Sequence, residues 1–419
     1  MSLLPLPDTK ETLIVVGTTV RRNLDVLHAH LASVARQELP PRVKLHFCYV
    51  PDFTSQQQDA QQYLLRWVNE RGGELVRSAH PPNESDFYDG PNADSHQWGG
   101  TAMARVGANK NLILHRALHL RADAVWLVDS DLVLDPTTLA SLLACEKPVV
   151  SAVFWTKWSK RGTETSQVHA APQVWLNHPY ALEGRGLDAA GFRKKLVEKE
   201  LTQVWGFGAC TLVSTDVIRA GVTFDYLPDV PLDGLMAGED RHFALRCERL
   251  HIPCYADPWP DIAHVYHAED QSRLPAWTAR LCEAHPATPT LSDLVALRLR
   301  ALEPVSVSPG RVQQFGPEHV RGVLAGLDLQ PELREAVLTM TRGESRIVKV
   351  HFPSHHPHPF LRGRIRLIDV LLVDCKPNVP PPVLDEELYR GVKSGAVLDY
   401  TTLSHHQHLD IRADGGADA

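Results

Sequence analysis

Residues 125–136 read VWLVDSDLVLDP, and this stretch decides the fold class that the chain is expected to adopt. Four apolar residues run into Asp129 and Asp131, which are one residue apart, and a second apolar run follows. Short runs rich in Val, Leu and Ile are typical of strands buried on both faces of a sheet. Asp135 and Pro136 then introduce a predicted helix, because proline is favoured in a helix's first turn. The two aspartates are therefore predicted to lie at the carboxyl end of a strand.

Strand-sized apolar runs alternate with helical patterns before this stretch. The expected strands are residues 12–17, 43–50 and 74–78, and the expected helices are residues 23–37, 56–71 and 102–120. After residue 148 the pattern becomes mixed, with antiparallel pieces. This order predicts an α/β fold in which a Rossmann-like mixed sheet is flanked by helices. Such sheets bind ligands beyond the carboxyl ends of their strands.

Changes in composition divide the 419 residues into three parts. We expect the α/β domain at residues 1–285, a helical linker region at 286–345, and a small C-terminal α+β module with a disordered tail at 346–419. Within the linker region, residues 291–302 and 331–340 are expected to form helices.

Composition and charge disfavour several classes of protein. The net charge of −7 argues against a nucleic-acid binder, which would carry a basic excess. No apolar run approaches the roughly 20 residues that span a bilayer, and the N-terminus lacks the basic region of a signal peptide. The seven cysteines include no CxxC pair, which indicates reduced thiols. We therefore expect a cytoplasmic protein without a transmembrane segment.

The paired aspartates favour a metal ion. Side chains at positions i and i+2 of an extended segment point to the same side, so Asp129 and Asp131 resist joint ionisation unless a cation lies between them. Oxygen ligands suit Mg²⁺ or Mn²⁺, which commonly bridge a protein carboxylate to substrate phosphates. The alternative interpretation is a solvated turn after a strand, since the tripeptide is common by chance.

Three segments in order resemble the nucleotide-sugar-dependent glycosyltransferases of the GT-A fold, in particular the large inverting family-two group. They are the strand at residues 13–17 with its TTVR exit, the RVGANKN segment at 105–111, and the DSD at 129–131. The resemblance covers residues 11 to about 270. It implies a nucleotide-binding set: Thr18, Thr19, Arg21, Arg105, Asn109 and Asp129.

The resemblance also implies the ligands of a metal. Asp131 would bind the metal directly, and Asp129 would contact the ribose or reach the metal through water. His264 matches the histidine that completes the metal shell in many such enzymes, with His267 as a less favoured choice. Either histidine has a simpler interpretation as a packed or surface side chain. A mixed Asp/His site favours Mn²⁺ somewhat over Mg²⁺.

A base and a sugar pocket follow from the same resemblance. Glu239 and Asp240 open a helix, where negative charge is favoured, so helix capping is one interpretation. The family has its general base here, which implies Asp240 first and Glu239 second. The WGFG segment, Trp205, Gly206, Phe207 and Gly208, would line the sugar and acceptor pocket, because glycines allow close approach and aromatic faces suit sugar rings. A bend between core strands is the alternative.

The expected activity is transfer of a sugar from a nucleotide diphosphate to an acceptor hydroxyl, with inversion. By resemblance the donor is a UDP- or GDP-sugar, and the acceptor is a saccharide, a small molecule or a protein. A sugar nucleotidyltransferase is an alternative, but its Gly-rich phosphate loop is missing from TTVRRN. A non-catalytic GT-A-like glycan-binding or scaffold protein is a second alternative, disfavoured by the intact acidic motifs and the late histidine.

Overall fold

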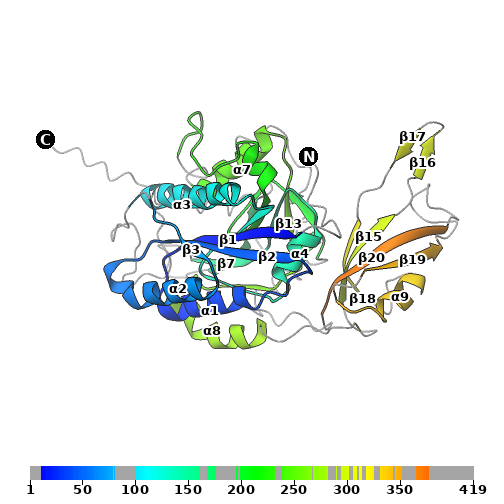
Figure 1. The fold of residues 1–419 in the computed structure, drawn as a ribbon, viewed down its shortest axis with the longest axis horizontal. Coiled ribbons are helices and arrows are strands. Elements are labelled where there is room, and N and C mark those ends of the chain that lie inside the picture. The colour runs from blue at the N-terminus through cyan, green and yellow to red at the C-terminus, as the bar shows by residue number, and fades with distance from the viewer. Residues whose placement is uncertain are drawn as a thin grey trace.

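The computed structural model describes residues 11–78, 80, 100–159, 168–175, 195–196, 199–232, 238–266, 268–281, 289, 294–301, 305–308, 311–313, 318–324, 331–342, 345–351 and 365–376. They form an α/β domain followed by a smaller antiparallel sheet (Figure 1).

An eight-stranded sheet of described residues lies at the centre of the α/β domain, in the order β10-β13-β6-β12-β4-β1-β2-β3. Its strands are β1 (Thr12–Val20), β2 (Val43–Pro51), β3 (Glu74–Leu75), β4 (Ala124–Val128), β6 (Val149–Ala152), β10 (Thr202–Val204), β12 (Cys210–Ser214) and β13 (Cys254–Asp257). β2 and β4 pair parallel to β1, β3 pairs parallel to β2, and β13 pairs parallel to β6. β12 is antiparallel to β4 and β6, and β10 is antiparallel to β13. The expected Rossmann-like mixed sheet is confirmed.

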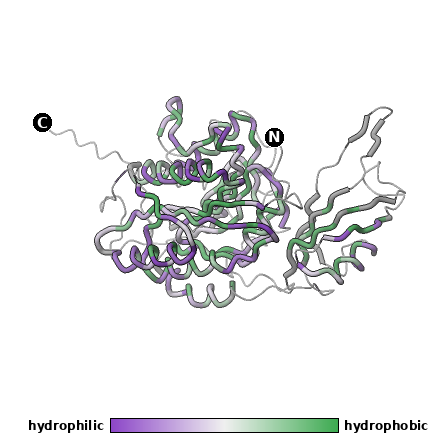
Figure 2. Tube along the Cα trace, viewed as in Figure 1, coloured by the Kyte–Doolittle hydropathy of each residue, from purple (hydrophilic) through white to green (hydrophobic). Residues whose placement is uncertain are grey.

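Helices cover both faces of this sheet, as Figure 1 shows for α3 and α7 on one face and α1 and α2 on the other. The helices of this domain are α1 (Leu24–Ala35), α2 (Gln58–Glu70), α3 (Gly100–His119), α4 (Thr138–Ala144), α6 (Thr215–Arg219), α7 (Glu239–Arg249) and α8 (Ala268–Leu281), with a 3-10 turn η1 (Ser55–Gln57). Ile14 and Val16 of β1 pack with α1 and α2, whereas Val15 packs with α3. Because side chains alternate across a strand, burial on both faces requires an unbroken apolar run. Hydrophobic residues accordingly follow the central strands (Figure 2).

Short strand pairs border the central sheet. They are β5 (Leu132–Leu134) with β14 (Ile262–His264), β7 (Trp155–Ser159) with β8 (Val168–Pro172), and β9 (Val174–Trp175) with β11 (Gly206–Phe207). The β5–β14 pair is antiparallel and joins the segment after the DSD tripeptide to residues more than a hundred positions later.

Gly17 of β1 lies where β2 and α3 both come close to the backbone. A methyl group at this position would overlap the carbonyl oxygen of Cys48 and lie 2.7 Å from Cγ2 of Ile113. We expect Gly17→Ala to lower the free energy of unfolding by about 1–3 kcal/mol, because the buried neighbours must move. Chemical denaturation would measure it. Lys44→Ala on β2, at a side chain 63% exposed, is the control and should stay within about 0.5 kcal/mol. Equal stability of the two variants would contradict this expectation.

A four-stranded antiparallel sheet forms the C-terminal module, in the order β18-β15-β20-β19. Its elements are β15 (Leu294–Ala301), β18 (Glu318–Leu324), α9 (Pro331–Val337), β19 (Ser345–His351) and β20 (Ile365–Lys376), and a hairpin of β16 (Val305–Ser308) and β17 (Arg311–Gln313) also occurs. Leu333 and Val337 of α9 pack on Val348 and Val350 of β19. The expected small α+β extension is confirmed, and so is the helix expected at residues 331–340, as α9.

The helix expected at residues 291–302 is wrong, because β15 occupies this stretch. Its sequence, LVALRLRA, is rich in residues that favour helices. Pairing with β18 on one side and β20 on the other overrides that local preference. The region expected to be a helical linker therefore contributes β15 and β18 to the same sheet as residues 365–376.

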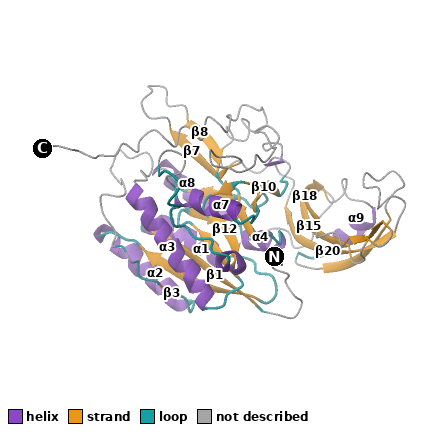
Figure 3. Cartoon of the chain, turned by 90° about the horizontal axis from the view of Figure 1, so that it is seen from above, coloured by secondary structure: helices purple, strands orange, loops and turns teal. Residues whose placement is uncertain are grey.

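The module packs against the α/β domain beside α4 (Figure 3). Ala144 and Trp259 of the larger domain form a buried cluster with Ala296 of β15 and Val373 of β20. An ion pair between Arg342 and Glu38 also joins the two units. In the part of the chain that the structure describes, every helix is too short or too polar to span a membrane.

Candidate functional site

The carboxyl ends of β1, β2 and β4 meet at one edge of the sheet and carry charged residues. Arg21 and Arg22 follow β1, Asp52 follows β2, and Asp129 and Asp131 follow β4. The paired aspartates therefore occupy the position predicted from the apolar run before them. The carboxyl edge is where sheets of this class bind ligands.

Asp131 and His264 lie side by side. The antiparallel pairing of β14 with β5 sets His264 opposite Leu132, and its Nε2 atom is 3.3 Å from Oδ2 of Asp131. The Nδ1 atom of the same ring is 2.8 Å from Oγ1 of Thr156, which fixes the orientation of the ring. The alternative histidine, His267, lies outside the described residues.

Arg22 contacts the same carboxylate oxygen of Asp131, and sequence reasoning did not single it out. The Asp131 side chain is 5% exposed and the Arg22 side chain 15% exposed, so the pair is shielded from water. Neighbouring His30 is buried, and burial lowers its pKa to about 4, so its ring is neutral at physiological pH. Arg22 is therefore a described positive charge that opposes the Asp131 carboxylate.

The donor atoms at Asp131 and His264 fit a divalent cation that takes its other ligands from a substrate. Within the described ranges, no group of three or more His, Cys, Asp or Glu side chains is arranged to hold a metal ion. One carboxylate and one imidazole are nevertheless a common protein contribution where phosphate oxygens and water complete the shell. Among the described ion pairs, Asp129 pairs with Lys110 and not with His264.

Lys110 of α3 connects Asp129 to the acidic start of α7. Its Nζ atom is 2.8 Å from Oε1 of Glu239 and 3.9 Å from Oδ1 of Asp129. Burial alone would lower the pKa of Lys110, but the carboxylates of Asp129, Glu239 and Asp240 together raise it well above its usual range. Lys110 is thus a buried, permanently charged ammonium group.

Asp240 opens α7 and lines a pocket. The described residues that line this pocket are Lys110, Leu127, Asp129, Phe207, Gly208, Ala209, Thr211, Phe224, Asp240 and Phe243. Burial, followed by the charge of Glu239, raises the pKa of Asp240 to about 7. Burial also raises the pKa of Asp129, to about 6. A carboxyl group that titrates near pH 7 is suited to proton transfer.

The WGFG segment divides between this pocket and the core. Phe207 and Gly208 line the pocket. Trp205 is buried, and its Nε1 donates a hydrogen bond of 2.8 Å to Glu248. A methyl group at Gly206 would lie 2.9 Å from the ring of Trp175, so this glycine allows a close approach of β9 and β11. Phe207 and Gly208 thus face the pocket, whereas Trp205 and Gly206 pack in the core next to α7.

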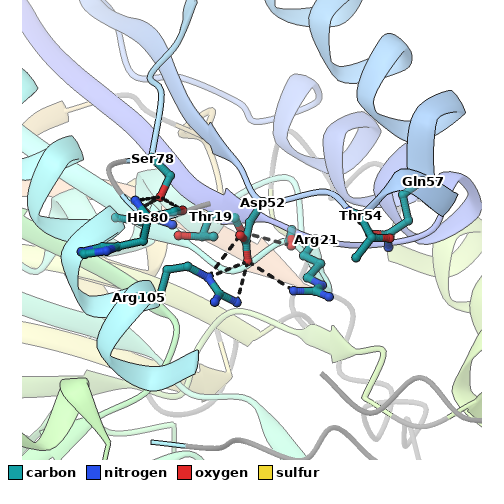
Figure 4. A network of polar contacts seen from close by, with 10 residues as sticks. Thr19, Arg21, Asp52, Thr54, Gln57, Ser78, His80 and Arg105 are labelled. Carbon is teal, nitrogen blue, oxygen red and sulfur yellow. Dashed lines mark hydrogen bonds and ion pairs between the residues drawn. The ribbon is translucent and has the colours of Figure 1, made fainter. Parts of the chain in front are cut away.

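Arg21 and Arg105 converge on Asp52, a fully buried carboxylate that sequence reasoning missed (Figure 4). Nε of Arg105 is 3.2 Å from Oδ1 of Asp52, and Nη1 of Arg21 is 3.7 Å from Oδ2. Both arginines were expected to bind nucleotide. In the structure, both are buried and form ion pairs with Asp52. The signal for Asp52 was its place directly after a strand, at the same edge as Asp129.

Thr18, Thr19 and Asn109 lie close to this cluster. The Thr18 hydroxyl donates to the carbonyl of Thr19 at 3.2 Å. Oδ1 of buried Asn109 accepts a hydrogen bond of 2.7 Å from Oγ of Ser78. Counting described residues alone, Nδ2 of Asn109 and Oγ1 of Thr19 are buried and lack a hydrogen-bond partner. Buried polar atoms are normally bonded, so these two are candidate ligand contacts.

No family model matches the chain, and no curated protein matches it. Solved structures similar to it include TarS from S. aureus, at 15% identity over 58% of this chain and 35% of that chain, with a TM-score of 0.34. GalNAc-T7 with UDP, GalNAc and Mn²⁺ is 11% identical over 63% of this chain and 45% of that chain, with a TM-score of 0.39. The mannosyltransferase PcManGT from Pyrobaculum calidifontis, in complex with GDP-Man and Mn²⁺, is 13% identical over 62% of this chain and 60% of that chain, with a TM-score of 0.34. The chain thus spans less than two thirds of each of these structures.

Proposed function

We propose that the chain is a metal-dependent glycosyltransferase that moves a sugar from a nucleotide-diphosphate donor to an acceptor hydroxyl. The observation that carries this proposal is that Asp240 lines one pocket with Asp129, which lies two residues before Asp131. Two kinds of group support it. One is the Asp131–His264 pair, 3.3 Å apart, and the other is the Asp240 carboxyl group, whose pKa is raised to about 7. The first suits a cation on a diphosphate, and the second suits proton removal from an acceptor.

The donor would be a UDP- or GDP-sugar bound along the end of β1 and the middle of α3. The buried amide of Asn109 and the buried hydroxyl of Thr19 would bond the base or the ribose. Asp52, held by Arg21 and Arg105, supplies a fixed carboxylate in the same region. These polar groups would favour a nucleotide at this site.

Asp131 and His264 would hold Mn²⁺ or Mg²⁺, and the mixture of carboxylate and imidazole favours Mn²⁺. When bound, the cation would neutralise charge that develops on the diphosphate leaving group. Asp129, two residues before Asp131, would be available to the ribose or to metal-bound water.

Asp240 is our choice for the general base, with Glu239 as the second choice. The acceptor oxygen would attack the anomeric carbon as the bond from that carbon to the diphosphate oxygen breaks. The acceptor proton would pass to Asp240, and attack from the face opposite the leaving group gives inversion. Phe207 and Gly208, which line the pocket beside Asp240, would shape the space for the sugar or acceptor.

Calorimetry with UDP and GDP, each with and without Mn²⁺, tests the proposal. We expect one of the two nucleotides to bind at least about tenfold more tightly with Mn²⁺, a difference of about 1.4 kcal/mol or more, because the cation would bridge Asp131 and His264 to the diphosphate. The corresponding nucleotide sugar should be hydrolysed slowly without an acceptor. Absence of both binding and hydrolysis would instead support a non-catalytic scaffold. Release of pyrophosphate from a nucleoside triphosphate and a sugar phosphate would support a nucleotidyltransferase.

A further inference from the structure

Lys110 is a charged residue that the proposed reaction leaves without a role. It projects from the middle of α3 into the space between β4 and the start of α7, where it contacts Glu239 and approaches Asp129. Its ammonium group also lies 5.2 Å from the centre of the Phe224 ring. The Lys110 side chain therefore lies between Asp129, at the carboxyl end of β4, and Glu239, at the start of α7.

The local sequence is arranged to admit this contact. Gly107, one turn before Lys110, faces α7, and a methyl group there would lie 3.0 Å from Cβ of Glu239. A side chain at this position would press α3 and α7 apart at the level of the ion pair. The close approach of the two helices keeps Lys110 and Glu239 within hydrogen-bond distance in a site shielded from water.

Burial of a lysine is costly unless a carboxylate compensates its charge. The Glu239 side chain is 9% exposed, and its Oε1 atom lies 2.8 Å from Nζ of Lys110. Its carboxylate therefore compensates the charge of the lysine. Asp240, the next residue, makes no described hydrogen bond to Lys110 and faces the pocket instead. The two adjacent carboxylates are therefore not equivalent.

We propose that Lys110 is a positioning residue that gives the general-base role to Asp240 by holding the Glu239 carboxylate in an ion pair. This inference rests on the proposed function. The Glu239 carboxylate is held in the ion pair with Lys110. Asp240 is therefore the carboxylate that can exchange a proton with an acceptor. Lys110 thus acts through the acidic pair and does not itself contact the acceptor.

Among the described residues, five charged or titratable groups surround Asp240. They are Glu239 and Arg241 on α7, Lys110 on α3, Asp129 after β4, and Tyr226 in the loop before α7. After burial, the charge of Glu239 raises the pKa of Asp240, whereas Lys110 and Arg241 lower it. Removing the ammonium group should therefore move the titration of Asp240 to higher pH. Removing the charge of Glu239 should move it to lower pH.

The test compares Lys110→Met, Glu239→Gln and Lys110→Arg with the unmodified chain. The titration of Asp240 is followed by NMR of carboxyl-¹³C aspartate, with Asp240→Asn to assign the signal. The pH dependence of kcat/KM for nucleotide-sugar turnover is measured in parallel. Turnover should rise with pH as Asp240 loses its proton. We expect the midpoint to rise by about 1–3 pH units in Lys110→Met and to fall in Glu239→Gln. Lys110→Arg keeps the charge and should stay near the original midpoint.

An Asp240 titration that does not move in Lys110→Met would overturn the role of Lys110, whatever the turnover. If that variant does not fold, an unmoved or raised midpoint in Glu239→Gln overturns it instead. A moved titration without any turnover in the unmodified chain has a different meaning, because it supports the coupling to Lys110 and rejects the proposed function.

Discussion

Asp240→Asn is expected to lower kcat by about 10²–10⁴-fold, the usual contribution of a general base, while the affinity for the nucleoside diphosphate is kept. Asparagine has the size of aspartate but cannot take a proton from an acceptor hydroxyl. Asp240 lines the pocket, and burial together with Glu239 raises its pKa to about 7, so the wild-type group is poised to exchange a proton near neutral pH. The proposed nucleotide contacts at the end of β1 and in the middle of α3 are untouched by the change.

Steady-state kinetics would measure kcat, and calorimetry on the same preparations would measure the affinity for nucleoside diphosphate. Asp216→Asn is a matched control, because its side chain is 52% exposed on α6 and pairs with Arg219 away from the pocket. It should leave both kcat and affinity unchanged. A kcat of Asp240→Asn within about tenfold of the wild type would reject Asp240 as the base. A large loss in Glu239→Gln alone would then assign that role to Glu239.

The fold was largely predictable because the central strands are buried on both faces. Residues 13–16 of β1 alternate between two cores, so the sequence there is apolar without interruption and the strand is evident locally. The same logic located Asp129 and Asp131, since a polar pair directly after a buried run marks the end of a strand. The helix predicted at β15 was wrong for the opposite reason. The conformation of LVALRLRA is determined by pairing with the distant strands β18 and β20 and not by its local sequence.

The polar contacts of the site were less accessible to prediction, because they join residues far apart in the sequence. Lys110 and Glu239 are 129 residues apart, and Arg105 and Asp52 are 53 apart. Each residue has an ordinary local context, a lysine within a helix or an aspartate after a strand. No spacing rule connects such pairs, and only the meeting of α3 with α7 and with the end of β2 reveals them. His264 was placed by resemblance, and the structure brings it beside Asp131 through the β5–β14 pairing.

The second large effect is expected at Asp131. Asp131→Asn should reduce the Mn²⁺-dependent affinity for nucleoside diphosphate by at least about 100-fold, since even groups that only orient metal ligands are worth about 10–100-fold. The substitution keeps the shape of the side chain but removes the charge that His264 and Arg22 both approach. The nucleotide affinity without Mn²⁺ should change far less, because the contacts at Asn109 and Thr19 remain.

Asp129→Asn separates the two aspartates of the DSD tripeptide. Asp129 faces Lys110 at 3.9 Å and has no described contact with His264, so its loss should weaken Mn²⁺-dependent binding less than the loss of Asp131. Calorimetric titration of nucleoside diphosphate at fixed Mn²⁺, and again with a chelator, gives the metal-dependent part for each variant. Thermal unfolding of the same samples shows whether the fold is intact. If folded Asp131→Asn binds the nucleotide with Mn²⁺ as tightly as the wild type does, Asp131 is not the metal ligand. The Arg22–Asp131 ion pair would then be a structural feature of the strand edge.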